Sequence, residues 1–251
     1  MKYSVYTFIF GKDYDKLREI QYVDPEVEYI CVTDNKDLRS DTWKIIYTDM
    51  QLSSEATSVQ RAFSARWQWH SFTTTDICVI MDASVSIVQN LQPLIHRISK
   101  YDAMIMSHVC RDTIADEYIA WIQSRGVDMK YMEQFARYVY PYDIQHVKGL
   151  FSTGMMIMNR NENTISLSNS VLQMMQQVSN SEDRVDQIYL SYLLNTKYFN
   201  TLDICFTTMQ YMFTRYFNLH YHNTDCVITE FAQNMNNRYQ NNKIIHLHED
   251  I

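Results

Sequence analysis

The chain has 251 residues, of which 46% are hydrophobic and 20% are charged, so it can fold around a substantial core and does not resemble a disordered protein. Its formal net charge of −7, without a long basic run, argues against a dedicated nucleic-acid-binding protein, which needs clustered lysine and arginine. Four glycines and three prolines leave little for glycine-rich phosphate loops, and neither a Walker-type loop nor a G-x-G-x-x-G fingerprint occurs.

Several features predict a soluble, cytoplasmic protein. The five scattered cysteines are odd in number and form no C-x-x-C, which indicates a reducing compartment without a disulfide framework. The segment Met1–Phe10 is too short and too polar for a signal peptide. No apolar run reaches the roughly 18–20 residues of a membrane span, so contact with a membrane would be peripheral.

In the first part of the chain, strands are expected to alternate with helices, as in parallel βαβ units. The apolar pattern predicts strands at Tyr3–Phe10, Glu28–Val32 and Trp43–Tyr47, a short helix at Tyr14–Ile20, and a longer helix at Ser58–Phe72.

The apolar stretch Asp76–Met81 predicts a strand that is buried on both faces at the centre of an α/β sheet. Asp82 ends it, and the apolar alternation resumes at Val85. Open α/β sheets bind ligands at the carboxyl ends of their strands. A charge there is costly unless a cation or hydrogen bonds compensate it. An aspartate that merely begins a turn is the alternative interpretation.

The second part continues as helices around further strands, with no repeat, low-complexity segment or linker, so we expect a single α/β domain with a mostly parallel sheet. The expected helices are Leu91–Ile98, Thr113–Gln123, Met129–Val139, Ile165–Val178 and one opening at Ser181–Gln187; the expected strands are Ala103–Met106, Met155–Asn159, Leu202–Phe206 and a short one at Ile244–Leu247.

Several motifs, in this order, resemble nucleotide-sugar glycosyltransferases of the GT-A type over about Tyr3 to Leu194. They are Val32-Thr33-Asp34-Asn35, Met81-Asp82-Ala83-Ser84 at the place of the D-x-D motif, Lys148-Gly149-Leu150-Phe151-Ser152-Thr153-Gly154 with the strand to Asn159, and Asp186-Gln187, which resembles the D-Q of glycosyltransferase family 8. A poorly characterised branch found in bacterial polysaccharide loci and plants is most similar to the set Arg66, His70, Asp82-Ala83-Ser84, His108-Val109-Cys110-Arg111, Asp116-Glu117 and Asp186-Gln187.

The resemblance implies a Rossmann-like GT-A domain that moves a hexose or pentose from a nucleotide-diphosphate donor, with a UDP-sugar favoured, to a glycan, lipid-linked or protein acceptor. Its donor-binding half would be about residues 1–110 and its acceptor-side half about 111–251. The donor contacts that it implies are Asp34, Arg66, His70, Asp82, Ser84, His108, Arg111 and Gln187. Arg66 and His70 are four residues apart and are expected on one helix face, although a solvated basic face would show the same spacing.

Metal binding follows from the same resemblance, with one departure. Ser84 stands where the second aspartate of D-x-D is usual, so one anionic ligand is missing. Mn²⁺ or Mg²⁺ would be held by Asp82 and by His246, which resembles a late histidine of some GT-A enzymes, with the diphosphate supplying further oxygens. Without a metal, Arg66, His70 and Arg111 would have to neutralise the leaving diphosphate.

An inverting enzyme also needs a group that takes the acceptor's proton. Asp186 is the first candidate, since it matches the family motif and opens a helix whose dipole stabilises a carboxylate. Glu117 is the second, and each could instead be an acid at a helix start with no chemical role. A retaining enzyme needs no such base, and the sequence does not distinguish the two.

Two other functions stay open. The loss of the second aspartate is compatible with a non-catalytic nucleotide-sugar or glycan-binding protein on the same fold. An α/β hydrolase is disfavoured because the chain has no G-x-S-x-G elbow and no evident Ser/His/Asp set.

Overall fold

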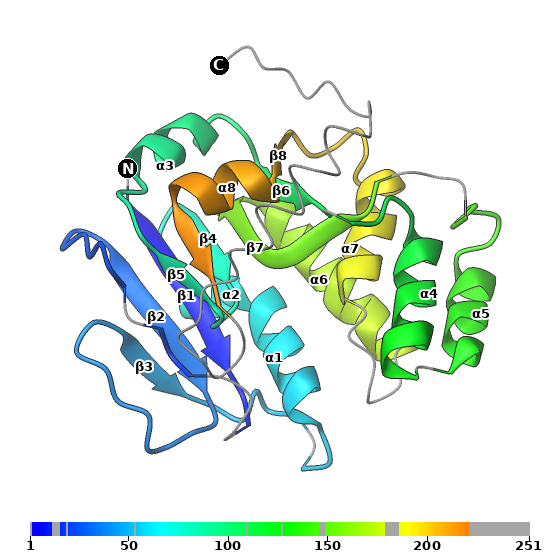
Figure 1. Cartoon of the computed structure of the whole chain (residues 1–251), viewed down its shortest axis with the longest axis horizontal. Coiled ribbons are helices and arrows are strands. Elements are labelled where there is room, and N and C mark those ends of the chain that lie inside the picture. Colours follow the sequence, from blue (N-terminus) through cyan, green and yellow to red (C-terminus); the bar gives the residue numbers. More distant parts are fainter. Residues whose placement is uncertain are drawn as a thin grey trace.

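The computed structural model describes residues 2–11, 16–18, 20–52, 54–108, 110–126, 128–145, 149–178 and 186–220. A seven-stranded sheet in the order β3-β2-β1-β4-β7-β6-β8 forms the centre of the molecule (Figure 1). Its strands are β1 (Tyr3–Ile9), β2 (Glu28–Thr33), β3 (Lys44–Tyr47), β4 (Ile77–Met81), β6 (Ala103–Ser107), β7 (Phe151–Asn159) and β8 (Ile204–Thr208). Every strand pair of this sheet is parallel except the two that β7 makes with β4 and β6, which confirms the mostly parallel α/β sheet.

The helices confirm most of the predicted elements, with small shifts at their ends. They are α1 (Ser58–Trp67), α2 (Trp69–Phe72), α3 (Gln92–Ile98), α4 (Ile114–Arg125), α5 (Met129–Tyr138), α6 (Glu162–Val178), α7 (Asp186–Asn195) and α8 (Met209–Arg215). The predicted helix at Tyr14–Ile20 is wrong for its described residues 16–18 and 20, which are not helical. The predicted strand Ile244–Leu247 lies outside the described residues.

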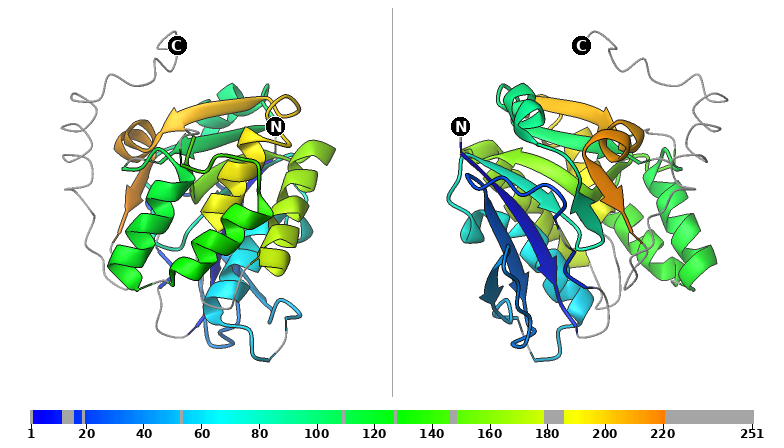
Figure 2. Two further views of the ribbon diagram at one scale, coloured as in Figure 1. Left: turned by 90° about the vertical axis from the view of Figure 1, so that its right-hand side faces the viewer. Right: turned by 60° about the vertical axis from the view of Figure 1, so that its left-hand side comes forward.

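The sheet separates two hydrophobic cores because successive strand side chains point to opposite faces. One core joins Tyr6, Ile80 and Met156 to buried residues of α1, α2 and α4–α7. The other joins Val5, Val79 and other strand residues to α3, α8 and the second sheet. Figure 2 shows these helices as separate layers on the two sides of the sheet. The continuous burial of β4 follows from this double cover, as its unbroken apolar run predicted.

A second, two-stranded sheet lies directly after β4. In it β5 (Val85–Ile87) pairs antiparallel with β9 (Phe217–Leu219), so the segment that follows Asp82 is tied to a distant part of the chain. The backbone N–H of His220 donates to the carbonyl of Ser84 at 2.9 Å, and the His220 Nε2 atom lies 2.8 Å from the Ser86 hydroxyl. The sequence pattern gave no signal for this pairing.

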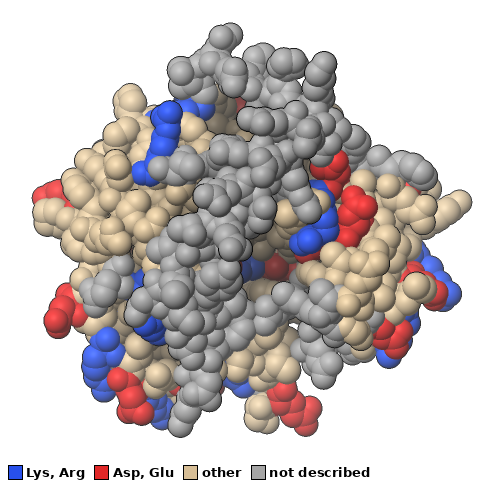
Figure 3. All heavy atoms as spheres, viewed as in Figure 1, with Lys and Arg blue, Asp and Glu red and all other residues tan. Residues whose placement is uncertain are grey.

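The surface seen in Figure 3 carries lysine and arginine interspersed with aspartate and glutamate. Within the described parts of the chain, no helix combines the length and the apolar character that crossing a bilayer requires.

Asn159, at the end of β7, holds the end of α3. Its side-chain amide donates to the carbonyls of Ile98, the last residue of α3, and of Ser99 and Tyr101, which follow the helix. The Asn159→Asp variant replaces these donors by a negative charge at a helix C-terminus, so we expect the free energy of unfolding to fall by about 2 kcal/mol. The matched control is Asn90→Asp at the start of α3, where Oδ1 accepts the backbone N–H of Gln92 at 2.8 Å, so aspartate keeps this bond and urea unfolding should show no loss. Equal losses in both variants would contradict this role of Asn159.

Candidate functional site

Asp82 lies at the carboxyl end of β4, where the buried strand reaches solvent. Its backbone N–H donates to the carbonyl of Gly154 at 2.9 Å, and its own carbonyl accepts the N–H of Val85 at 2.9 Å, so the strand ends in a tight turn. The side chain is 34% exposed. A Cβ atom on Gly154 would stand 3.4 Å from Asp82 Oδ2, so the glycine backbone borders the carboxylate directly.

Arg66, in the last turn of α1, bridges two carboxylates. Its Nη2 donates to Asp82 Oδ1 and its Nη1 to Asp186 Oδ2, while Nη1 also donates to the hydroxyl of Thr153 at 3.1 Å. The side chain is 5% exposed. Burial alone lowers the pKa of the Arg66 guanidinium, but the charges of Asp186 and Asp82 outweigh it and raise that pKa, so Arg66 stays charged.

Two aromatic rings hold the Arg66 guanidinium in place. Its central carbon lies 5.1 Å from the ring centroid of Phe8, on β1, and 5.2 Å from that of Phe63, on α1. A planar guanidinium offers a rigid fork of donors and packs on aromatic faces, which a lysine ammonium does not reproduce. Arg66 is therefore a fixed bridge, and we call Asp82, Arg66, Thr153, Trp67 and Asp186 the Arg66 cluster.

Asp186 was expected at a helix start, and it is the first residue of α7. It does not face solvent. Its side chain is 3% exposed. Besides the bond from Arg66, it accepts the indole N–H of Trp67 at 3.1 Å and the hydroxyl of Thr153 at 3.4 Å. A carboxylate that is buried among three donors does not suit the expected role of general base, because the hydroxyl of the molecule that receives the sugar has to reach it.

His108, Arg111 and Glu117 form a second cluster, which we call the His108 cluster, after the end of β6. Arg111 Nε donates to Glu117 Oε2, and Arg111 Nη2 lies 3.0 Å from His108 Nε2. The Glu117 side chain is 3% exposed, so this second candidate base is also buried and paired with an arginine. The three residues contact one another and fix the loop between β6 and α4.

The ring of His108 is held in its neutral form. Its Nδ1 accepts the backbone N–H groups of Cys110 and Arg111, each at 3.2 Å, so an added proton would displace two donors. Burial and the positive charge of Arg111 lower the pKa of His108 to about 3.

This environment predicts a loss of stability in acid. The unfolded chain binds a proton on His108 below about pH 6.5, whereas the folded chain does so only near pH 3, so the free energy of unfolding falls as the pH drops from 6.5 towards 3. In the His108→Asn variant, the free energy of unfolding, measured with urea between pH 7 and pH 4.5, should change less steeply with pH. The difference in slope should be up to about 1.4 kcal/mol per pH unit. The control His96→Asn, at an exposed position on α3, should keep the original slope. An unchanged slope in His108→Asn would contradict the buried neutral ring.

Asp34 lies at the same edge of the sheet, at the end of β2. Its Oδ1 accepts the backbone N–H of Gly11 at 3.1 Å, which joins the ends of β1 and β2. Gly11 has φ +84°, and a Cβ atom there would lie 2.7 Å from the Ser58 hydroxyl, so this turn requires glycine. If the registers of β1 with β2 and with β4 are continued by one and two residues, two strand spacings separate Asp34 from Asp82 and their Cα atoms are roughly 12 Å apart.

The structure separates His70 from Arg66. Helix α1 ends at Trp67, Gln68 leaves the helical conformation, and α2 begins at Trp69, so the expected shared face does not exist. The His70 ring bonds to the side chain of Asn169 on α6, and burial and the charge of Arg160 lower its pKa. Arg160 donates its backbone N–H to the carbonyl of Asp76, at the amino end of β4, so His70 lies towards the edge opposite Asp82.

Three predicted site residues remain, namely Ser84, Gln187 and His246. Ser84 is buried in the turn between β4 and β5, and Gln187 follows Asp186 in α7 with a partly exposed side chain. His246 lies outside the described residues. Thr153 and Trp67 were not predicted as site residues, although a polar pair before Gly154 and a tryptophan beside Arg66 signal them. The structure also brings His220 next to Ser84 and Ser86.

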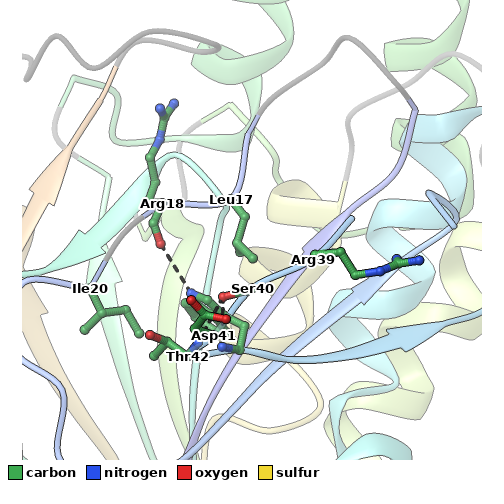
Figure 4. A pocket seen from close by; sticks show the side chains of 8 residues that line it. Leu17, Arg18, Ile20, Arg39, Ser40, Asp41 and Thr42 are labelled. Carbon is green, nitrogen blue, oxygen red and sulfur yellow. Dashed lines mark hydrogen bonds between the residues drawn. The ribbon is translucent and has the colours of Figure 1, made fainter. Parts of the chain in front are cut away.

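A pocket of about 320 Å³ lies elsewhere, at the amino end of β3 (Figure 4). Among its lining residues, Arg18 accepts the indole N–H of Trp43 through its carbonyl at 3.2 Å, and Figure 4 shows the guanidinium groups of Arg18 and Arg39 directed away from Asp41 and Thr42. Because this is the opposite end of the strands from Asp34 and Asp82, the pocket does not belong to the Arg66 cluster.

No protein-family model and no curated protein matches the sequence. Among solved structures, the chain is similar to mouse xyloside xylosyltransferase 1 in its apo form, with 10% identity, a TM-score of 0.48, and coverage of 84% of this chain and 86% of that one. It is similar to the galactosyltransferase LgtC in complex with donor and acceptor sugar analogues, with 11% identity, a TM-score of 0.49, and coverage of 96% and 97%. For the glycosyltransferase GlyE of Streptococcus pneumoniae TIGR4, the values are 11%, 0.43, 84% and 46%.

Proposed function

We propose that the chain is a GT-A type glycosyltransferase and that its nucleotide-diphosphate sugar binds across the ends of β2, β1 and β4. The observation that carries this proposal is the Arg66 cluster, because it fixes the carboxylate of Asp82 at the carboxyl end of a central strand, where open α/β sheets bind their ligands. Asp34 stands at the same edge at a distance that suits the two ends of a nucleoside diphosphate.

Among the described residues, the pairing of the basic side chains favours a cation as the partner of the diphosphate. Of the three basic residues expected to neutralise it, Arg66 bridges Asp82 and Asp186, Arg111 is paired with Glu117, and His70 lies elsewhere. Asp82 would be the carboxylate ligand of Mn²⁺ or Mg²⁺, with phosphate and water oxygens as further ligands. A bound ion would supply positive charge beside the leaving group.

The reaction breaks the bond between the anomeric carbon and the diphosphate through an oxocarbenium-like transition state. The main contribution of the site is positive charge that is already in place beside the leaving group, where negative charge accumulates. Asp82 would orient this end of the donor, since Arg66 and Gly154 hold it, while Asp34 would contact the nucleoside. Neither Asp186 nor Glu117 is an accessible base, which favours the retaining course that needs none.

The nature of the donor, the acceptor and the cellular setting are further parts of this proposal. A UDP-sugar is favoured as donor and a glycan, lipid-linked or protein molecule as acceptor, with polysaccharide biosynthesis in the cytoplasm as the setting. The free cysteines Cys31, Cys78, Cys110 and Cys205 support a reducing compartment. The division into a donor-binding half and an acceptor-side half stays a prediction.

Slow hydrolysis of the donor tests the proposal without knowledge of the acceptor. Purified protein would be incubated with UDP-, GDP-, CMP- and dTDP-sugars, with Mn²⁺ or with EDTA, and the released nucleotide would be measured. We expect turnover of one nucleotide class. Binding of a nucleotide-sugar without cleavage, also after glycans are added, would favour the alternative of a non-catalytic binding protein. The absence of both would contradict the proposal.

A further inference from the structure

We propose that Tyr47 and Lys36 hold and select the base of the donor nucleotide. The base stacks on the ring of Tyr47, and the ammonium of Lys36 donates to an oxygen at the edge of that base. The inference rests on the proposed function and deepens it, because it names the class of base that the donor carries.

Tyr47 is the last residue of β3, the edge strand next to β2 (Figure 1). It is paired in register with Thr33, and the backbone N–H of Thr48 donates to the carbonyl of Thr33 at 2.9 Å. The two strands therefore stay paired up to the residue before Asp34. Since Tyr47 is 51% exposed, a large aromatic residue is presented to solvent one strand away from the proposed nucleoside contact.

Lys36 comes two residues after Asp34 and lies over this ring, with its Nζ atom 5.0 Å from the ring centroid of Tyr47. The backbone N–H of Asn35 donates to Thr33 Oγ1 at 3.0 Å, so the turn that carries Lys36 is fixed to the end of β2. A cation–π contact at an exposed site is weaker than the stacking of a base on an aromatic ring. A base can therefore replace the ammonium on the ring, and the flexible lysine stem lets the ammonium move to the edge of the base.

The loop that follows Tyr47 has an unusual backbone. Met50 and Gln51 have φ values of 62° and 53°, in the left-handed region that residues with a side chain rarely adopt. The backbone N–H of Met50 donates to Thr48 Oγ1 at 3.0 Å, and Arg61 Nη1 donates to the carbonyl of Asp49 at 2.7 Å, so several contacts hold this conformation. Such conformations are concentrated at ligand sites. The loop thus supports a ligand at this end of β3.

The chemistry of two side chains selects among the bases. The carboxylate of Asp34 only accepts hydrogen bonds, and the ammonium of Lys36 only donates them. Uracil, thymine and guanine present a ring N–H beside a carbonyl oxygen, which complements an acceptor next to a donor. Cytosine carries an amino group in place of that oxygen. We therefore expect UDP, dTDP or GDP to bind more tightly than CDP.

Substitutions at the two positions have different expected effects. Tyr47→Ala removes the stacking surface and should weaken UDP binding by about tenfold or more, whereas Tyr47→Phe keeps the ring and should bind UDP about as tightly as the native protein. Lys36→Met removes the donor but keeps the length of the stem. It should weaken UDP binding by about tenfold and CDP binding much less, so the preference for UDP over CDP shrinks.

The experiment measures UDP and CDP binding by titration calorimetry in the presence of Mn²⁺, and folding by thermal melting. Tyr22→Ala controls for the loss of a partly exposed tyrosine, since Tyr22 is 40% exposed and lies close to Tyr3 at the amino end of β1. Lys44→Met, at the exposed first residue of β3, controls for the loss of one positive charge.

Two results would overturn the inference. One is UDP binding that is as tight in Tyr47→Ala as in Tyr22→Ala, and the other is a preference of the native protein for CDP. If Tyr47→Ala does not fold, the ratio of the UDP and CDP affinities in Lys36→Met and Lys44→Met decides, because loss of charge alone weakens both nucleotides equally.

Failure of this inference and failure of the proposed function give different results. If the native protein hydrolyses a nucleotide-sugar and Tyr47→Ala binds UDP with unchanged affinity, the role of Tyr47 is wrong while the glycosyltransferase proposal stands. If UDP binding depends on Tyr47 and Lys36 as expected but no nucleotide-sugar is hydrolysed, the base subsite stands and the proposed enzyme function is wrong. If no nucleoside diphosphate binds, both are wrong.

Discussion

Replacement of Arg66 by methionine should lower the free energy of unfolding by about 3–5 kcal/mol, because it leaves two carboxylates without their shared partner. Asp186 is buried at 3% exposure, so its charge would lose its ion pair without gaining water. Methionine keeps much of the apolar contact with the rings of Phe8 and Phe63, so the loss reports on the charge bridge. Urea unfolding followed by circular dichroism measures it.

The same substitution in the same helix provides the control. Arg61 bonds the carbonyls of Ala56 and Asp49 at the outer part of α1, so Arg61→Met should cost only about 1 kcal/mol. If Arg66→Met lowers the free energy of unfolding by no more than Arg61→Met does, the Arg66 cluster does not hold α1, β4 and α7 together as described.

The Asp82→Asn variant should hydrolyse the nucleotide-sugar about 10²–10³ times more slowly than the native protein, because it removes charge from the place where the donor diphosphate is oriented. Its side chain is 34% exposed, and asparagine can still accept from Arg66, so the fold should be retained. Release of the nucleoside diphosphate under single-donor conditions measures the effect, and thermal melting shows whether the variant is folded.

Asp76→Asn is the matched control, since Asp76 precedes the same strand at its other end and is exposed. It should hydrolyse the donor at the native rate. Equal rates in Asp82→Asn and Asp76→Asn would mean that the carboxyl end of β4 is not where the donor reacts.

The place of Asp82 could be predicted because local features determine it. The unbroken apolar run of β4 needs cover on both faces, which only a central strand of a layered sheet has, and the run stops at a carboxylate. The same reasoning placed Asp34 after β2 and the histidine of the His108 cluster after β6. Strand ends are visible in a sequence because hydrophobicity changes there within one or two residues.

Side-chain partnerships were not visible in this way. Arg66 and Asp186 are 120 residues apart and meet only because α1 and α7 pack on the same face of the sheet. The spacing of Arg66 and His70 predicted a shared face, but the helix breaks at Gln68, which no glycine or proline signals. Asp186 and Glu117 look like accessible acids at helix starts, and only the tertiary structure reveals that each is buried against an arginine.

The most direct test of the donor site is a thermal-shift measurement of the native protein and the Asp82→Ala variant against UDP-, GDP-, CMP- and dTDP-sugars, with and without Mn²⁺. A ligand that binds only the folded state stabilises it by about 2.7 kcal/mol at a hundredfold excess over its Kd, which raises the melting temperature. We predict a shift for one nucleotide class that is larger with Mn²⁺ and is lost in Asp82→Ala. No shift with any nucleotide-sugar at millimolar concentration, in the presence of the metal, would contradict a donor site at the end of β4.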